Sequence, residues 1–134
     1  MKNANYYKIL FLIAGIWNLG VAIPCWIGSV FIPDVFFNIF NMSSPASLFP
    51  FHAMFLFIIV FGIGYITVSR DITKKHGIIL IGLLGKILFF IVCIITLSLN
   101  EANIMLLATG IIDLIFAILF IEFLLKIKKV SSQI

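Results

Sequence analysis

The sequence predicts an all-α integral membrane protein whose four transmembrane helices form an antiparallel bundle. Of its 134 residues, 63% are hydrophobic and only 10% are charged, and the mean hydropathy is +1.28. Soluble domains have about 25% charged residues and about 45–50% apolar ones. A helix needs roughly 20 apolar residues to cross a hydrocarbon core of about 30 Å. Four stretches meet this requirement: Ile9–Phe31, Pro50–Ser69, Gly77–Leu99 and Asn103–Leu125.

These four stretches predict one transmembrane domain that covers residues 1–134. Barrel strands would be about 10 residues long with strict alternation of polar and apolar positions, and the stretches show neither feature. The first stretch follows a charged start, as a signal peptide does. Its apolar run exceeds the roughly 7–15 residues of a signal-peptide core, and no A-x-A-like cleavage site follows. We therefore expect a retained first helix.

The cations predict the orientation of the helices. Eight of the nine Lys and Arg residues lie before the first stretch, between the second and third, or after the fourth: Lys2, Lys8, Arg70, Lys74, Lys75, Lys126, Lys128 and Lys129. The other two connections carry only Asp34 and Glu101. The positive-inside rule then places both termini and residues 70–76 in the cytoplasm of a cell-membrane protein. The net charge of +4 thus reflects the orientation of the chain in the lipid bilayer, and we expect no nucleic-acid partner.

The longest connection, residues 32–49, predicts a short interfacial helix in the first outer loop. Pro33 suits a first helical position. Asp34, Asn38 and Asn41 would share one helical face, away from the aromatic residues between them, which is typical of a helix lying in the interface. Two interpretations are open: a connector anchored among lipid headgroups, or a lid over a pocket that faces outward.

Three polar residues lie near the bilayer midplane on three different predicted helices. Lys86 is the only charge between Gly77 and Leu99, and it lies about 14 Å along its helix at 1.5 Å per residue. Asp113 lies about 15 Å in from the opposite side, and Asn18 about 14 Å in from Ile9. Small and polar residues share their helical faces, which is typical of the faces at which membrane helices pack.

A lone charge at this depth costs at least about 2.5–3.5 kcal/mol on insertion scales. The lysine side chain cannot reach the interface from there, whereas Glu122 lies near the helix end beside Lys126 and is expected at the surface. Asp113 is the only acid at the depth of Lys86, so we expect the two to pair, with Asn18 completing the hydrogen bonds. The pair either holds helices together or forms a site for a ligand or a proton, because ionisable groups inside membranes are commonly functional.

Further polar residues extend this stripe toward the outer side and predict a cavity that opens outward. They are Cys25, Ser29, Cys93, Thr96, Thr109 and His52. Cys25 and Cys93 lie at one level, but their spacing matches no metal-binding motif. We therefore expect no metal and no cofactor, and the sequence assigns no catalytic residue.

Three classes of function remain open. The first is binding or transport of a small molecule or proton, and a transporter of only four helices implies a homo-oligomer. The second is an enzyme that acts on a lipid-soluble substrate. The third is an accessory subunit whose ion pair specifies helix packing.

Overall fold

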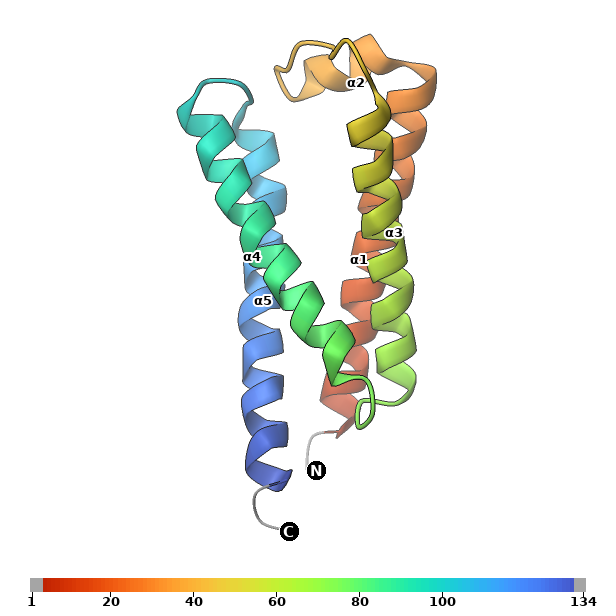
Figure 1. Ribbon diagram of the computed structural model, residues 1–134, viewed down its shortest axis with the longest axis vertical. Coiled ribbons are helices and arrows are strands. Elements are labelled where there is room, and N and C mark those ends of the chain that lie inside the picture. The colour runs from red at the N-terminus through yellow and green to blue at the C-terminus, as the bar shows by residue number, and fades with distance from the viewer. Residues whose placement is uncertain (1–3, 132–134) are drawn as a thin grey trace.

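The computed structural model describes residues 4–131 and confirms the all-helical class. It has five helices: α1 (Ala4–Phe31), α2 (Pro33–Ile39), α3 (Phe49–Arg70), α4 (His76–Ser98) and α5 (Ile104–Ser131), shown in Figure 1. The described residues contain no strand. Four of the helices are long and apolar enough to cross a membrane. The chain is therefore a multi-pass membrane protein. Lys2 lies outside the described residues, as does the side chain of Lys129.

The bounds of α3 and α4 agree with the predicted stretches to within one residue at each end, whereas α1 and α5 are longer than predicted. α1 begins at Ala4 rather than Ile9, and α5 ends at Ser131 rather than Leu125. Hydropathy marks only the part of a helix that suits hydrocarbon. The additional turns bring the Tyr7 hydroxyl to Glu122, to which it donates a hydrogen bond of 3.0 Å. This hydrogen bond joins the first turns of α1 to the last turns of α5.

The four long helices are arranged as two close pairs, α1 with α3 and α4 with α5. The backbones of α1 and α3 approach closely at two glycines. A Cβ atom added to Gly15 would lie 2.8 Å from the carbonyl oxygen of Gly62. Without side chains at these positions the helices gain dispersion contacts that lipid does not replace.

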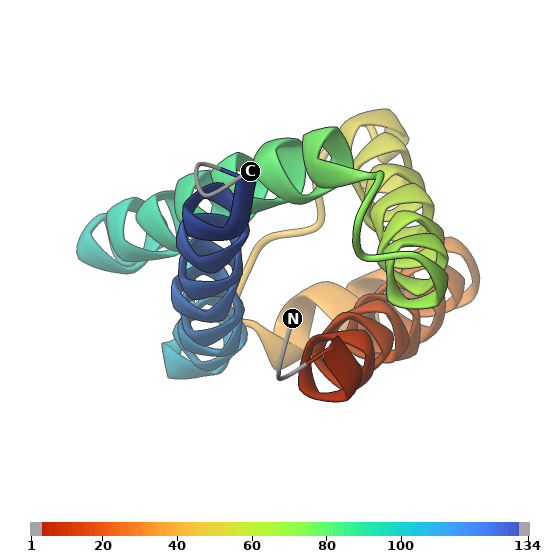
Figure 2. The same cartoon turned by 90° about the horizontal axis from the view of Figure 1, so that it is seen from below.

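The two pairs meet at one end of the molecule and diverge toward the other (Figures 1 and 2). We call the first the basic end, since it carries Lys8, Arg70, Lys74, Lys75, Lys126 and Lys128. We call the other the α2 end, because α2 lies across it (Figure 1). Large aromatic side chains close the basic end. The ring centroids of Phe11 and Phe120 are 5.0 Å apart, as are those of Phe11 and Phe123.

The loop between α3 and α4 lies at the basic end, and the Asp71 carboxylate accepts two hydrogen bonds within it. The backbone N–H and the hydroxyl of Thr73 both donate to Asp71, at 3.1 and 2.6 Å. These hydrogen bonds lower the pKa of Asp71 below its usual range. Asp71 therefore stays ionised and lies 3.8 Å from the Lys74 ammonium, which offsets part of the positive charge of this end.

Helix α2 packs its aromatic residues inward. Phe36 and Phe37 are buried, and their rings contact Phe55 and Phe51 of α3 at centroid distances of 5.9 and 4.8 Å. Asp34, Asn38 and Asn41 are exposed, as their shared face predicts. The helix ends at Ile39, short of the predicted Asn41, where a φ of 56° turns the chain out of the helix. Asparagine tolerates this left-handed conformation better than most residues.

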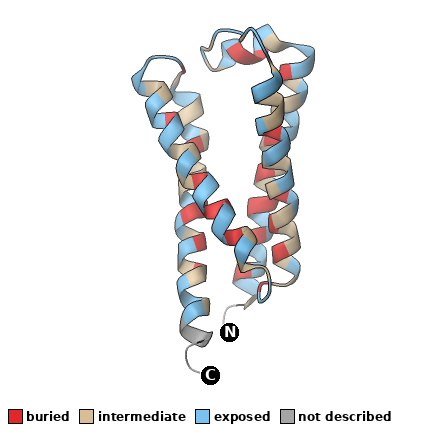
Figure 3. Cartoon of the chain, in the orientation of Figure 1, coloured by how far each residue is buried: buried red, intermediate tan, exposed pale blue. Residues whose placement is uncertain are grey.

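Buried side chains form two apolar clusters on the facing sides of the helices, while the outer faces are exposed (Figure 3). The larger cluster fills the half toward the basic end and includes Tyr7, Phe11, Tyr65 and Phe120. The smaller one holds α2 against α3.

Candidate functional site

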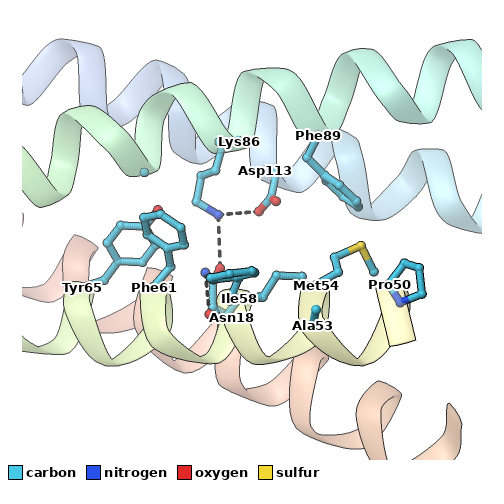
Figure 4. A pocket seen from close by; sticks show the side chains of 13 residues that line it. Asn18, Pro50, Ala53, Met54, Ile58, Phe61, Tyr65, Lys86, Phe89 and Asp113 are labelled. Atoms are coloured by element: carbon cyan, nitrogen blue, oxygen red, sulfur yellow. Dashed lines mark hydrogen bonds and ion pairs between the residues drawn. The ribbon is translucent and has the colours of Figure 1, made fainter. Parts of the chain in front are cut away.

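The three midplane residues of the sequence meet in one cluster, which we call the polar cluster (Asn18, Lys86 and Asp113). The Lys86 ammonium donates to Asp113 Oδ1 at 2.5 Å and to Asn18 Oδ1 at 3.2 Å (Figure 4). The Asn18 amide in turn donates to the Ile58 carbonyl oxygen of α3 at 3.5 Å. Four helices therefore converge on the polar cluster: α1 and α3 from one pair, α4 and α5 from the other.

The cluster is buried unevenly. Lys86 and Asn18 are 4% and 6% exposed, whereas the Asp113 side chain keeps 18% of its surface. The Lys86 ammonium also lies 5.6 Å from the Tyr65 ring centroid and 5.2 Å from that of Phe116. Aromatic faces attract a cation by their quadrupole. The pair, the amide and the two rings together offset the cost of keeping a charge in this apolar region.

Tyr65 and Phe116 are parts of this site that the sequence prediction missed. An aromatic residue on an apolar helix gives no sign of its neighbour. The sequence feature that indicates a large neighbour at this site is Gly82, which lies one turn before Lys86 on α4. A Cβ atom at Gly82 would collide with the ring and hydroxyl of Tyr65, so the glycine is what admits this side chain beside the lysine.

Two hollows reach the polar cluster from different sides. The first, which we call the central cavity, has a volume of about 330 Å³ and lies beneath α2, between the two helix pairs. Asn18, Asp113 and Glu101 line it. Its other lining side chains are aromatic, aliphatic or small and polar, and they include Trp17, Val21, Cys25, Phe36, Phe37, Phe40, Phe55, Phe89, Thr96, Leu106 and Thr109. Phe36 and Phe37 of α2 line the cavity at the α2 end.

The second hollow, which we call the α3–α4 groove, has a volume of about 430 Å³. It lies between α3 and α4, and Figure 4 shows the side chains that line it. Asn18 and Asp113 line both the groove and the central cavity. Lys86 lines the groove but not the central cavity. The two hollows therefore present different parts of one cluster.

Three of the six residues predicted to line an outward cavity do line the central cavity: Cys25, Thr96 and Thr109. The two threonine hydroxyls donate to carbonyl oxygens of their own helices, at 2.9 Å for Thr96 and 2.7 Å for Thr109. Such bonds satisfy the hydroxyl donor within an apolar helix and leave the oxygen able to accept a hydrogen bond.

Ser29, Cys93 and His52 do not line either hollow. Ser29 is fully buried and donates to the Trp26 carbonyl oxygen at 2.8 Å. Cys93 is 1% exposed and packs toward Gly110, where an added Cβ atom would lie 3.0 Å from its sulfur. His52 keeps a buried Nε2 without a hydrogen-bond partner among residues 4–131. Of the three, Cys93 lies at a contact between α4 and α5, which hydropathy does not reveal.

The structure brings no metal-binding group together in the described part of the chain. Groups of three or more His, Cys, Asp or Glu side chains are absent there. Both cysteines are free, Cys25 half-buried and Cys93 buried. The polar cluster itself offers one ammonium, one carboxylate and one amide, and the Glu101 carboxylate also lines the central cavity.

Glu122 lies at the surface, as predicted, and has a second role that was not predicted. It pairs with Lys126 at 2.6 Å, one turn along α5. It also accepts the hydroxyl hydrogen bond of Tyr7 and so joins α1 to α5. The ion pair of Glu122 and Lys126 lies in the last turns of α5, toward the basic end, and its residues line neither hollow.

Comparison with known proteins adds no relative to this description: the chain matches no protein-family model, no curated protein and no solved structure.

Proposed function

We propose that the protein binds or transports a small ligand or a proton at the polar cluster, which the ligand reaches through the central cavity. In this proposal the four long helices cross the cell membrane in alternating directions. Both termini lie in the cytoplasm, and α2 lies on the outer side. The cations of the basic end support this orientation, since short cytoplasmic connections are rich in Lys and Arg.

One observation carries the proposal: Asp113 is paired but not enclosed. Its side chain is 18% exposed, and it lines a cavity of about 330 Å³ together with Asn18. An ion pair that only fastened helices would be expected to have its remaining lone pairs and protons satisfied by further protein hydrogen bonds, because these bonds are what offset the cost of desolvating the two charges. A site, in contrast, must leave a charged group within reach of its ligand.

The aromatic closure at the basic end supports a cavity with a single aqueous opening. Tyr7, Phe11, Phe120 and Phe123 are fully buried there. For transport, these side chains would have to separate while the α2 end closed. Binding alone would require no such change.

A ligand that copurifies with the protein tests the proposal directly. Wild type, a neutral double variant (Lys86→Met with Asp113→Leu) and a control double variant (Glu122→Gln with Lys126→Met) would be extracted in mild detergent and analysed by mass spectrometry. The control removes an ion pair of the same type that lies outside both hollows. We expect a bound small molecule in the wild type and in the control, and its loss from the neutral double variant. The same molecule at equal occupancy in all three proteins would leave the polar cluster with only a packing role.

A further inference from the structure

The α3–α4 groove gives the polar cluster a second face, and this face is turned to the bilayer. Phe57 on α3 is 65% exposed, and Gly85 on α4 is exposed. Both line the groove together with Lys86, and Figure 4 shows the lysine between the two helices. In a membrane-spanning chain, an exposed groove at this depth is in contact with hydrocarbon and not with water.

The groove is open because the residues beside the polar cluster are small. An added Cβ atom at Gly85 would meet no atom within 4 Å, and Ala53 lines the facing side on α3. One turn further along α4 toward the basic end, Tyr65 covers Gly82 and ends the open space. The polar cluster thus lies at the closed end of a slot that hydrocarbon chains can enter from the side.

The hydrogen-bonding state of Lys86 indicates what could bind there. An ammonium has three N–H donors, and within the described residues Lys86 uses two, one to Asn18 and one to Asp113. The remaining donor has only the groove or an aromatic face to point to, since Lys86 is 4% exposed. A hydrogen-bond acceptor in the groove would satisfy it.

The charge balance of the polar cluster limits this acceptor to a neutral group. Lys86 and Asp113 already offset one another at 2.5 Å. A charged ligand would add a net charge at the bilayer midplane, where an unpaired charge is unfavourable. A neutral carbonyl or ether oxygen adds none.

We propose that the ligand is a neutral, lipid-soluble amphiphile that enters from the bilayer through the α3–α4 groove, with an acceptor oxygen on the Lys86 ammonium and its chain between α3 and α4. This inference rests on the proposed ligand site at the polar cluster. It adds the ligand class, and it replaces the route through the central cavity by a lateral route from the bilayer.

Photolabelling in lipid nanodiscs tests both the ligand class and the lateral route. The probes share one long alkyl chain with a diazirine near its head and differ only in the head: a methyl ketone, no polar head, a carboxylate or a trimethylammonium group. Peptide mass spectrometry locates the labelled residues. We expect saturable labelling by the ketone beside the groove, around Ala53, Phe57 and Gly85. Its apparent affinity should exceed that of the other three probes about tenfold, as one hydrogen bond to a charged donor implies.

Two glycines offer a matched pair of variants. Gly85→Leu fills the groove, whereas Gly20→Leu adds the same side chain at another exposed position of a long helix. Neither added Cβ atom meets a neighbour within 4 Å, so both variants should fold, and Gly20 lines neither hollow. We expect ketone labelling to weaken about tenfold or more in Gly85→Leu and in the neutral double variant, and to be unchanged in Gly20→Leu.

The other outcomes separate this inference from the proposed function. Ketone labelling that is lost in the neutral double variant but kept in Gly85→Leu would place the ligand in the central cavity; the lateral route would then be wrong, and the site would stand. Equal labelling by the headless probe would show that the groove binds lipid chains without a hydrogen bond to Lys86, and tighter labelling by a charged probe would overturn the ligand class.

Cross-links between two copies of the chain at Phe57 would show that a second protomer covers the groove, so that lipid could not enter it. Saturable labelling that persists in the neutral double variant would overturn both proposals.

Discussion

The environment of Lys86 explains why a cation is stable in the middle of an apolar helix. Its ammonium has a carboxylate at 2.5 Å and an amide oxygen at 3.2 Å, and two aromatic rings lie within 6 Å of it. Its partners come from α1 and α5, so each contact also ties α4 to another helix. The residue-level consequence is that Lys86 and Asp113 should behave as one unit.

Single truncations of this pair should be more harmful than their combination. Lys86→Met or Asp113→Leu alone leaves an uncompensated charge and should lower the free energy of unfolding by about 3–5 kcal/mol. The neutral double variant removes both charges and should melt close to the wild type. Thermal melting of the four proteins in detergent gives the coupling energy. If neither single variant lowers the melting temperature, the two residues are not partners.

Gly82 should be far less tolerant of a side chain than Gly20. An added Cβ atom at Gly82 would collide with Tyr65, and one at Gly20 would meet nothing. Gly82→Ala should therefore cost about 1–3 kcal/mol through overpacking. Gly20→Ala should be neutral or stabilising by about 0.5–1 kcal/mol, as for glycine in a helix interior. Melting temperatures measured side by side decide this, and an unaffected Gly82→Ala protein would contradict the placement of Tyr65.

At the scale of elements, α2 links the two helix pairs. Its aromatic residues pack on α3, and its last carbonyl groups are bound from the connection between α4 and α5. The Asn103 side chain donates to the Ile39 carbonyl oxygen at 2.8 Å, and the Asn103 backbone N–H donates to that of Phe40 at 2.9 Å. These bonds satisfy orphan carbonyls at a helix end and hold α2 over the central cavity.

Removing the Asn103 side chain should make the central cavity easier to enter. Asn103→Ala loses two side-chain hydrogen bonds: the one to Ile39 of α2 and the one that Oδ1 accepts from the Met105 N–H at 3.0 Å. Only the first reaches α2, and its loss of about 1 kcal/mol should make an open position of α2 about fivefold more populated. Cys25 lines the cavity and reports on this through its rate of reaction with a small membrane-impermeant thiol reagent. Cys93, which is 1% exposed, should stay unreactive.

Ser98→Ala is the control for this experiment. Its hydroxyl donates to the Ile95 carbonyl oxygen within α4 and does not touch α2. A Cys25 rate that rises equally in both variants, or in neither, would show that Asn103 does not hold α2 over the cavity.

The elements themselves were predictable where one physical property defined them. Continuous hydropathy located the four long helices, and Pro33 with its spaced polar residues located α2. The inward packing of Phe36 and Phe37 was not predictable, since aromatic side chains suit both a lipid interface and a protein core. Asn103 gave no signal either, because its partners on α2 are backbone carbonyl groups.

At the scale of the whole molecule, the prediction of the site rests on how deep each polar residue lies within the membrane-spanning stretch. Lys86, Asp113 and Asn18 were grouped because each lies near the middle of its helix, and the structure brings them together. Depth does not specify which helices are neighbours. The pairing of α1 with α3, the contribution of Tyr65, and the positions of Ser29, Cys93 and His52 outside the cavity depend on rotation and close approach, as at Gly15 and Gly62.

The orientation of the molecule is tested by fusions. A reporter that is active only in the cytoplasm should work when it is attached after Ile134 or within residues 70–76. It should fail within residues 32–49 or near Glu101, since these connections lack cations. The reverse pattern would place α2 in the cytoplasm, and the central cavity would then open to the cytoplasm rather than to the outside.

The most direct test of the central claim asks whether the charges of the polar cluster serve binding and not only packing. The measurement is the rise in melting temperature that the copurified ligand causes when it is added back to delipidated wild type and to the neutral double variant. A ligand that binds only the folded protein must raise its stability. We predict a rise for the wild type and none for the double variant, although both melt at similar temperatures without ligand. An equal rise in both proteins would show that Lys86 and Asp113 only hold the helices together.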